Sequence, residues 1–226
     1  MSAMKPKGEP FLLFYSILLQ LIVVGGFGIN GWLNTEALPP ISNLVITHGV
    51  IMLIWFMLVP LQAFLIRRSS YKLHIAFGIT SLGIALGIII SGTMISVDNY
   101  QRTGDPSVLT VNLPILINFT ILYSTAIYRR KYSDEHKRLI LFSSIAMMAP
   151  ALGRISRIVG VDEFLSIPMW LVLLIVPFVY DKQRLNRIHK STWLGAVLIV
   201  LGILFAIVTL GSSTWSQFLE YMFGRG

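Results

Sequence analysis

The feature of this sequence that most limits its possible folds is a series of apolar runs. Each run is roughly 20 residues long, which is the length that a helix needs to cross a bilayer core of about 30 Å. The runs lack the alternation of apolar and polar residues that a membrane β-barrel requires. The sequence therefore predicts an all-α integral membrane bundle of about seven transmembrane helices, forming a single domain over residues 1–226. The expected spans are residues 11–31, 43–66, 72–95, 108–128, 137–157, 164–180 and 192–212.

The distribution of basic residues predicts how these spans are oriented. Fourteen of the 18 Lys and Arg residues fall in alternate connections, and by the positive-inside rule those connections are cytoplasmic. We therefore expect the N-terminus in the cytoplasm and the C-terminus outside. The net charge of +8 follows from this topology and from attraction to anionic lipid, so it implies no nucleic-acid partner. The fourteen residues are Lys5, Lys7, Arg67, Arg68, Lys72, Arg129, Arg130, Lys131, Lys137, Arg138, Lys182, Arg184, Arg187 and Lys190.

The absence of cysteine removes several kinds of chemistry. The chain has no thiol of its own for disulfides, thiolate catalysis, iron–sulfur ligation or the covalent attachment of c-type haem. Histidine, carboxylate and methionine side chains are the strong ligands that remain. The four histidines are thus the main candidates for binding a cofactor.

Each of the four histidines lies inside a predicted span or close to its end, where an imidazole is costly unless it binds something. His48 lies about five residues from the outer end of the second span. His74, His136 and His189 lie at the inner ends of the third, fifth and seventh spans. We therefore expect one histidine near the outer face and three at the cytoplasmic side, all of them candidate cofactor-binding residues.

Plainer roles remain open for two of these histidines. Ser133 is an expected helix N-cap, and the acidic Asp134 and Glu135 suit the positive end of the helix dipole. An interfacial residue of the first helical turn is therefore as good an interpretation of His136 as a cofactor ligand. His189 stands among basic residues and is equally interpreted as a side chain that extends to the lipid headgroups.

Two arginines form a second candidate site near the outer end of the fifth span. Arg154 and Arg157 are three residues apart, so they share one helix face and together suit a single anionic group. Their expected depth is near that of His48. The alternative interpretation is a pair of interfacial arginines that form ion pairs with nearby acids such as Asp98 or Asp162.

The stretch HGVIMLIWFMLVPLQAFLIRR, residues 48–68, is followed by the pair Leu73-His74. It resembles the second span and following turn of the cytochrome b561 group, in which a histidine–glycine pair opens one span and a further histidine opens the next. The resemblance implies transmembrane electron transfer through b haems held by pairs of histidines, one pair near each face. In this chain the outer side has only His48, while the inner side has three candidates.

The chain as a whole also resembles a group of small bacterial membrane proteins. This second resemblance implies a multi-pass protein of the bacterial inner (cytoplasmic) membrane and brings no established chemistry. The motifs that carry it are His48-Gly49, Leu73-His74, His136-Lys137-Arg138-Leu139, and Arg187-Ile188-His189 with Thr192.

We expect a membrane-embedded haem-b redox protein that carries out electron transfer. His74 and His136 are the preferred inner axial ligands, and His48 with Arg154 is the candidate outer site for a quinone, a haem or a haem propionate. Met94 or Met147 offers a second axial ligand on the outer side. The expected partners are the lipid bilayer and a quinone or another redox protein.

Two other functions remain open on the sequence. A cytoplasmic-side zinc site of His74, His136 and His189 would make the chain a metal-dependent membrane hydrolase, because three histidines and an open position suit a zinc ion that activates water. The spacing of these residues matches no metal-binding motif. The remaining alternative is a non-enzymatic membrane protein that binds a ligand or assists assembly.

Overall fold

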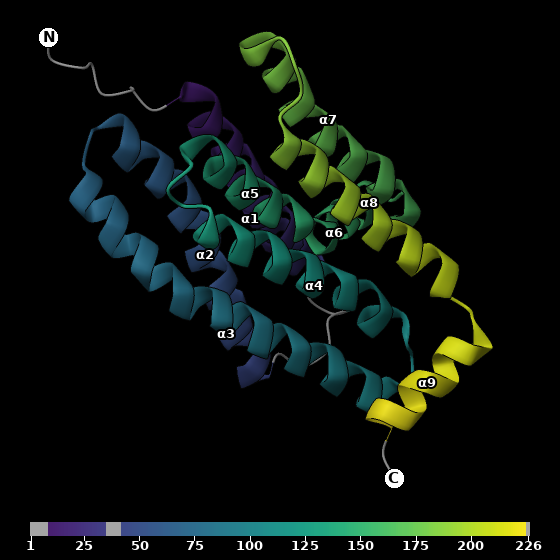
Figure 1. Ribbon diagram of the computed structural model, residues 1–226. Coiled ribbons are helices and arrows are strands. Elements are labelled where there is room, and N and C mark those ends of the chain that lie inside the picture. Colours follow the sequence, from purple (N-terminus) through teal and green to yellow (C-terminus); the bar gives the residue numbers. More distant parts are fainter. Residues whose placement is uncertain (1–8, 35–41, 225–226) are drawn as a thin grey trace, which may run out of the picture.

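The computed structural model describes residues 9–34 and 42–224. The regular elements in this part of the chain are helices, which confirms the predicted all-α class. Most of them run alongside one another in an elongated bundle, and the short α9 lies at an angle at one end (Figure 1). Their bounds are α1 Pro10–Leu33, α2 Asn43–Arg67, α3 Tyr71–Thr103, α4 Ser107–Tyr128, α5 Ser133–Ala146, α6 Ala149–Val159, the 3-10 turn η2 Glu163–Leu165, α7 Ser166–Leu185, α8 Lys190–Thr209 and α9 Ser213–Phe223.

Five of the described helices are long and apolar enough to cross a membrane, namely α1, α2, α3, α4 and α8. Helices α5 and α6 make a sixth if they are counted as one bent span. Helix α7 is not in this set, and its last turns carry Asp181, Lys182 and Arg184. The structure thus supports a multi-span membrane protein. Of the basic residues used to orient the spans, Lys5 and Lys7 lie outside the described residues.

The expected straight span over residues 137–157 is instead broken. Helix α5 ends at Ala146, α6 begins at Ala149, and the two helices are bent by 45°. Pro150 lies at the start of α6. Proline has no N–H to donate, and its ring clashes with the carbonyl four residues earlier, so a helix that reaches this position must kink or restart.

The long outer connection expected around residues 96–108 is mostly helical. Helix α3 continues to Thr103, and only Gly104, Asp105 and Pro106 separate it from α4. Gly104 has a φ of 69°, a left-handed conformation that glycine adopts readily and that ends the helix. The polar residues that suggested a loop are accommodated because this part of α3 extends past the apolar run.

The chain after the seventh expected span forms a further helix that the sequence did not predict. Gly211 has a φ of 82° and separates α8 from α9. Ser212 caps α9 by accepting a hydrogen bond from the Trp215 N–H. Leu219 of α9 is buried against Tyr100 and Leu109, so α9 covers the last turn of α3 and the first turn of α4.

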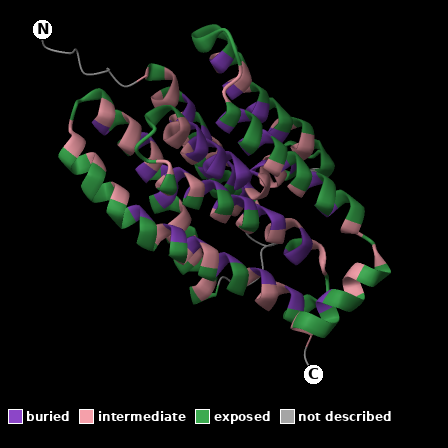
Figure 2. Cartoon of the chain, viewed as in Figure 1, coloured by how far each residue is buried: buried purple, intermediate pink, exposed green. Residues whose placement is uncertain are grey.

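The core lies in the middle of the bundle, where the buried residues gather (Figure 2). Trp55 of α2 meets Phe119 and Tyr123 of α4 edge to face, and its indole N–H donates to the Ser144 hydroxyl of α5. The Asn118 side chain, an amide within a span, donates to the Leu198 carbonyl at 2.9 Å, as a polar group in a bilayer requires. These contacts tie α2, α4, α5 and α8 together.

A buried ion pair joins three helices at one end of the bundle. The Arg138 guanidinium of α5 donates from Nε to Oδ1 of Asp181 on α7 at 2.8 Å. The other carboxylate oxygen of Asp181 accepts from the His189 backbone N–H at 2.9 Å and from the Thr192 hydroxyl at 2.5 Å. The Asp181 side chain is 0% exposed and that of Arg138 is 3% exposed. The pair therefore connects α5, α7 and the start of α8 with its polar atoms satisfied.

We predict that Asp181→Asn destabilises the protein by about 3–5 kcal/mol, because it leaves the buried Arg138 charge without its counter-charge. The measurement is the loss of monodisperse detergent-solubilised protein on heating. Asp98→Asn is the matched control, since it breaks an exposed pair with Arg102 that is worth about 0–1 kcal/mol. Equal thermal stability of the two variants would contradict the structural role given to Asp181.

Candidate functional site

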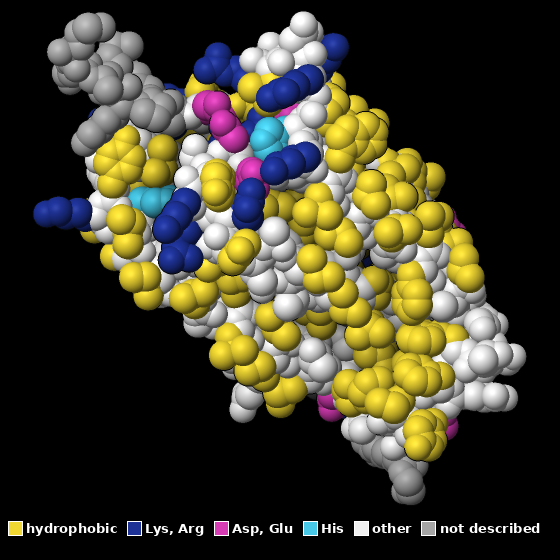
Figure 3. All heavy atoms as spheres, in the orientation of Figure 1, with side chains coloured by type: hydrophobic (Ala, Val, Ile, Leu, Met, Phe, Trp, Pro, Cys, Tyr) yellow, Lys and Arg dark blue, Asp and Glu magenta, His cyan; other side chains and the backbone are white. Residues whose placement is uncertain are grey.

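Three of the four histidines lie at the same end of the bundle. His74 is in the first turn of α3, His136 is in the first turn of α5, and His189 is the N-cap of α8. The rings of His74 and His136 are close enough to interact electrostatically. Figure 3 shows histidine side chains at the end of the molecule where most of the visible Lys and Arg side chains gather. The structure thus brings two predicted ligand residues, His74 and His136, near one another.

The His136 ring is held in a defined tautomer by the end of α4. Its Nδ1 lies 2.8 Å from the Ala126 carbonyl oxygen. A carbonyl only accepts hydrogen bonds, so Nδ1 carries the proton and Nε2 of the neutral ring carries the lone pair. The Arg129–Glu135 ion pair, with Nη2 and Oε1 at 3.0 Å, fixes the α4–α5 turn that creates this contact. Histidines that bind metals are usually held in this way by their other ring nitrogen.

His74 and Gln62 each keep one buried polar atom without a partner among the described residues. These atoms are Nδ1 of His74 and the side-chain oxygen of Gln62. The Gln62 amide N–H₂ donates to the backbone carbonyl of His74 at 3.2 Å, which ties α2 to the start of α3. An unpaired buried polar atom is costly, so Nδ1 of His74 and the Gln62 oxygen are each suited to a further hydrogen bond.

His48 lies apart from the other histidines, at the interface of α2 and α3. Its Nδ1 is 2.8 Å from the Ser91 hydroxyl, which itself donates to the Gly87 carbonyl. The Ser91 oxygen therefore accepts from Nδ1–H of His48, and Nε2 again carries the lone pair. The ring packs close to Gly92, where an added Cβ would lie 3.5 Å from the His48 Cε1 atom.

His189 has a structural role that the sequence left open. Its Nδ1 accepts a hydrogen bond from the Ser191 backbone N–H at 3.1 Å and so caps α8. Burial lowers the pKa of His189, and the neighbouring Arg138 charge lowers it further, while acidic neighbours including Asp181 oppose these effects. The lone pair used for the cap is the same one that Nδ1 would need to bind a metal.

The structure does not assemble the tri-histidine zinc site considered from the sequence. Among the described residues, no group of three or more His, Asp or Glu side chains is arranged to hold a metal ion. The nearby carboxylates have other partners. Asp181 is bound by Arg138, and Glu135 pairs with Lys190 at 2.9 Å as well as with Arg129.

The two arginines of the candidate anion site, at the outer end, lie in different surroundings. Arg154 of α6 donates to the Pro150 carbonyl at 2.8 Å, and its guanidinium lies 4.0 Å from the centre of the Phe27 ring on α1. Arg157 is exposed. Arg154 thus contacts α6 and α1, whereas the His48 ring contacts α3. These contacts direct the two side chains into different helix interfaces.

The two candidate methionine ligands on the outer side also differ in surroundings. Met94 of α3 is exposed on the outside of the bundle. Met147 is buried at the α5–α6 break, within the main core cluster. The contacts described for the His48 ring are with Ser91 and Gly92. Neither methionine thioether is among them.

Sequence reasoning missed the buried role of Arg138, which was counted only as a cytoplasmic cation. A signal for it was present, because Phe142 and Ile145 follow Arg138 at four and seven residues and are both fully buried. Helical spacing therefore places Arg138 on the face that points to the core. A charge on such a face requires a buried partner, and Asp181 provides it.

No family model matches the chain, and no curated protein sequence or solved structure is significantly similar to it. The fold and the site define a multi-span helical membrane protein with two imidazoles near each other at its basic end. The proposal of a function therefore rests on the residues and contacts described above.

We predict that the stability of the protein falls below about pH 6.5, the ordinary pKa of histidine, partly through His189. The folded state lowers the pKa of His189, so the unfolded chain takes up the proton first and stability decreases as the pH falls. His189→Asn keeps a capping side chain without titrating. Thermal unfolding measured between about pH 5 and 8 should show a weaker decline for this variant, and parallel curves for the two proteins would contradict the assignment.

Proposed function

We propose that this protein is a membrane-embedded redox protein that holds haem b between His74 and His136. The observation that carries the proposal is the placement of two imidazoles, on α3 and α5, at the same end of the bundle and within electrostatic range of each other. His136 already presents a lone pair on Nε2. Nδ1 of His74 has no hydrogen-bond partner among the described residues, so this ring is not committed to another contact through that atom. Two imidazoles are the donor set that one bis-histidine haem needs.

Haem b, when bound, supplies reversible one-electron chemistry at its iron. The protein orients the His136 imidazole through the Ala126 carbonyl. The hydrogen bond from Nδ1–H to this oxygen makes the His136 imidazole more basic. Gln62 holds the backbone of His74 by donating to its carbonyl. Exposed cations near the two histidines, among them Lys72 and Arg130, offer counter-charges for propionates.

The number of spans and their orientation are also part of this proposal. We infer that α7 completes a bundle of seven spans, with the α5–α6 pair as one bent span, the N-terminus in the cytoplasm and the C-terminus outside. Support comes from the gathering of Lys and Arg side chains at one end of the molecule (Figure 3). The bacterial inner membrane is the proposed location.

We propose that His48 serves the exchange of electrons with a quinone or another redox protein near the outer face. Because its Nδ1–H is donated to Ser91, Nε2 is an acceptor suited to the hydroxyl group of a quinol. Arg154 is not required for this contact, since the structure directs it toward Phe27. No observation favours the zinc hydrolase or a role in assembly in the same way.

We predict that His74→Ala and His136→Ala each abolish stoichiometric haem binding, whereas His189→Ala leaves it intact. The reason is that only the first two imidazoles are proposed as axial ligands, while His189 caps α8. The measurement is the ratio of haem to protein, from the absorption of protein purified from haem-replete cells. A size-exclusion profile of each variant checks that it is folded. Full haem content in either ligand variant, or none in the wild type, would refute the proposal.

A second variant tests the site without removing a ligand. We propose that the Gln62 oxygen accepts from Nδ1–H of His74 when haem is bound, since both atoms are buried and unpaired. Gln62→Leu should then keep the haem and raise its midpoint potential, because His74 loses the acceptor that makes its ring more basic and stabilises ferric iron. Redox titration of the absorption spectrum measures the shift. An unchanged potential in a folded, haem-loaded variant would remove Gln62 from the site.

A further inference from the structure

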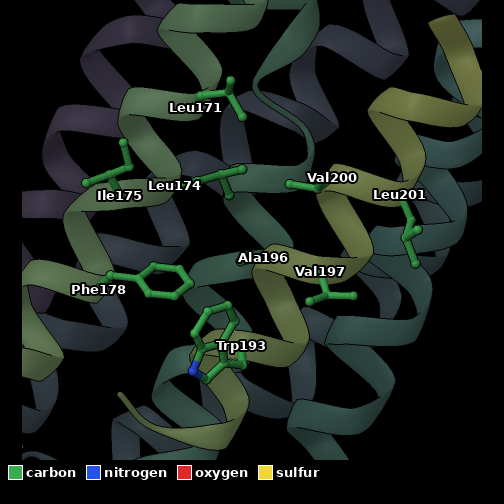
Figure 4. A pocket seen from close by; sticks show the side chains of 9 residues that line it. All are labelled: Leu171, Leu174, Ile175, Phe178, Trp193, Ala196, Val197, Val200 and Leu201. Atoms are coloured by element: carbon green, nitrogen blue, oxygen red, sulfur yellow. The ribbon is translucent and has the colours of Figure 1, made fainter. Parts of the chain in front are cut away.

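An apolar groove lies between α7 and α8, away from the histidines. Its volume is about 610 Å³, and Leu174 of α7 and Val200 of α8 point toward each other across the space between the helices (Figure 4). The floor is formed by the buried Leu174 and Ala196, while Ile175 and Leu201 on the walls are exposed. The remaining lining residues are Leu171, Phe178, Trp193 and Val197.

One end of the groove is closed by aromatic rings and then by charge. Phe178 and Trp193 meet edge to face with their ring centres 5.0 Å apart. Lys182 follows Phe178 by one helical turn, and Lys190 precedes Trp193 by three residues, so both cations lie just beyond the closed end. Lys190 is held at 2.9 Å by Glu135, and Lys182 donates to the Asn186 carbonyl at 3.3 Å.

The connection beyond this end is strongly basic. Residues 182–190 contain Lys182, Arg184, Arg187 and Lys190 and no acidic residue. A tryptophan at such a boundary is typical of the membrane–water interface, with its ring between the headgroup and acyl regions. The groove therefore combines an apolar channel, an interfacial aromatic pair and a cationic end, in that order along the helices.

We propose that this groove binds one anionic phospholipid, with an acyl chain between α7 and α8 and its phosphate near Lys182 and Lys190. An acyl chain fits because the lining residues are apolar throughout. The cations favour an anionic headgroup over a zwitterionic one, as basic pockets between spans at the cytoplasmic side do. A partner helix would need the apolar groove but not the cations, so the charge at its end distinguishes the lipid.

The site also has a physical basis in how α7 and α8 are joined. Asp181 and Thr192 bind the two helices together at the basic end, whereas the groove separates them farther along. An acyl chain would fill this space and protect the exposed walls. The site does not involve His74 or His136, so it stands or falls independently of the proposed haem.

The test uses the full-length protein in vesicles that contain brominated phosphatidylglycerol or brominated phosphatidylcholine, because bromine quenches tryptophan fluorescence on contact. The contribution of Trp193 is the difference between the wild type and Trp193→Phe. We expect phosphatidylglycerol to quench Trp193 at a mole fraction at least about fivefold lower than phosphatidylcholine, the factor expected for one cation near a membrane surface. Lys182→Gln combined with Lys190→Gln should remove this preference.

Two control variants sharpen the result. Arg67→Gln combined with Arg68→Gln removes two cations from the α2–α3 connection and should leave the preference unchanged. Ala196→Leu fills the floor of the groove and should weaken quenching by phosphatidylglycerol. Haem content, measured in the same samples, reports the separate redox proposal.

Several outcomes would overturn the lipid site. Equal quenching by the two lipids would show ordinary boundary lipid, and a preference that survives the double lysine variant would place the anion elsewhere. Val197→Cys introduces the sole cysteine of the chain at the groove. Its oxidation to a disulfide-linked dimer within the membrane would show that a second copy occupies the groove instead.

Discussion

The ion pair between Arg138 and Asp181 is the interaction on which the histidine-bearing end of the bundle depends. It is buried, and each remaining polar atom of Asp181 is used by α8, through the His189 N–H and the Thr192 hydroxyl. Removing either charge leaves the other uncompensated in an apolar interior. His136 lies two residues before Arg138, so the ion pair that fixes α5 also positions the His136 imidazole.

The four histidines have different roles because different atoms approach Nδ1 of each ring. At His136 and His48 that nitrogen donates to an oxygen, which leaves Nε2 as an acceptor. At His189 it accepts from the backbone, so the ring is a helix cap. His74 has no partner for Nδ1 among the described residues. The atoms that approach Nδ1, rather than the histidines alone, separate candidate ligands from structural residues.

The spans were predictable where apolar length alone decides, as in α1, α2, α4 and α8. Two places where a single residue redirects the backbone were not predicted. Pro150 divides the fifth span, and Gly211 separates α9 from α8. The gathering of three histidines at one end follows from the spacing of the spans. Helical spacing places Arg138 on the core face of α5, but its partner Asp181 was not predictable, because only the packing of α5 against α7 and α8 brings the two charges together.

The central claim is that His74 and His136 together bind one haem b. The most direct measurement is the electron paramagnetic resonance spectrum of the oxidised, purified protein at low temperature. A low-spin ferric signal with the anisotropy of two imidazole ligands, accounting for one haem per chain, is the result that we predict. A high-spin signal with an open axial position, or the absence of any haem signal in protein from haem-replete cells, would contradict the claim.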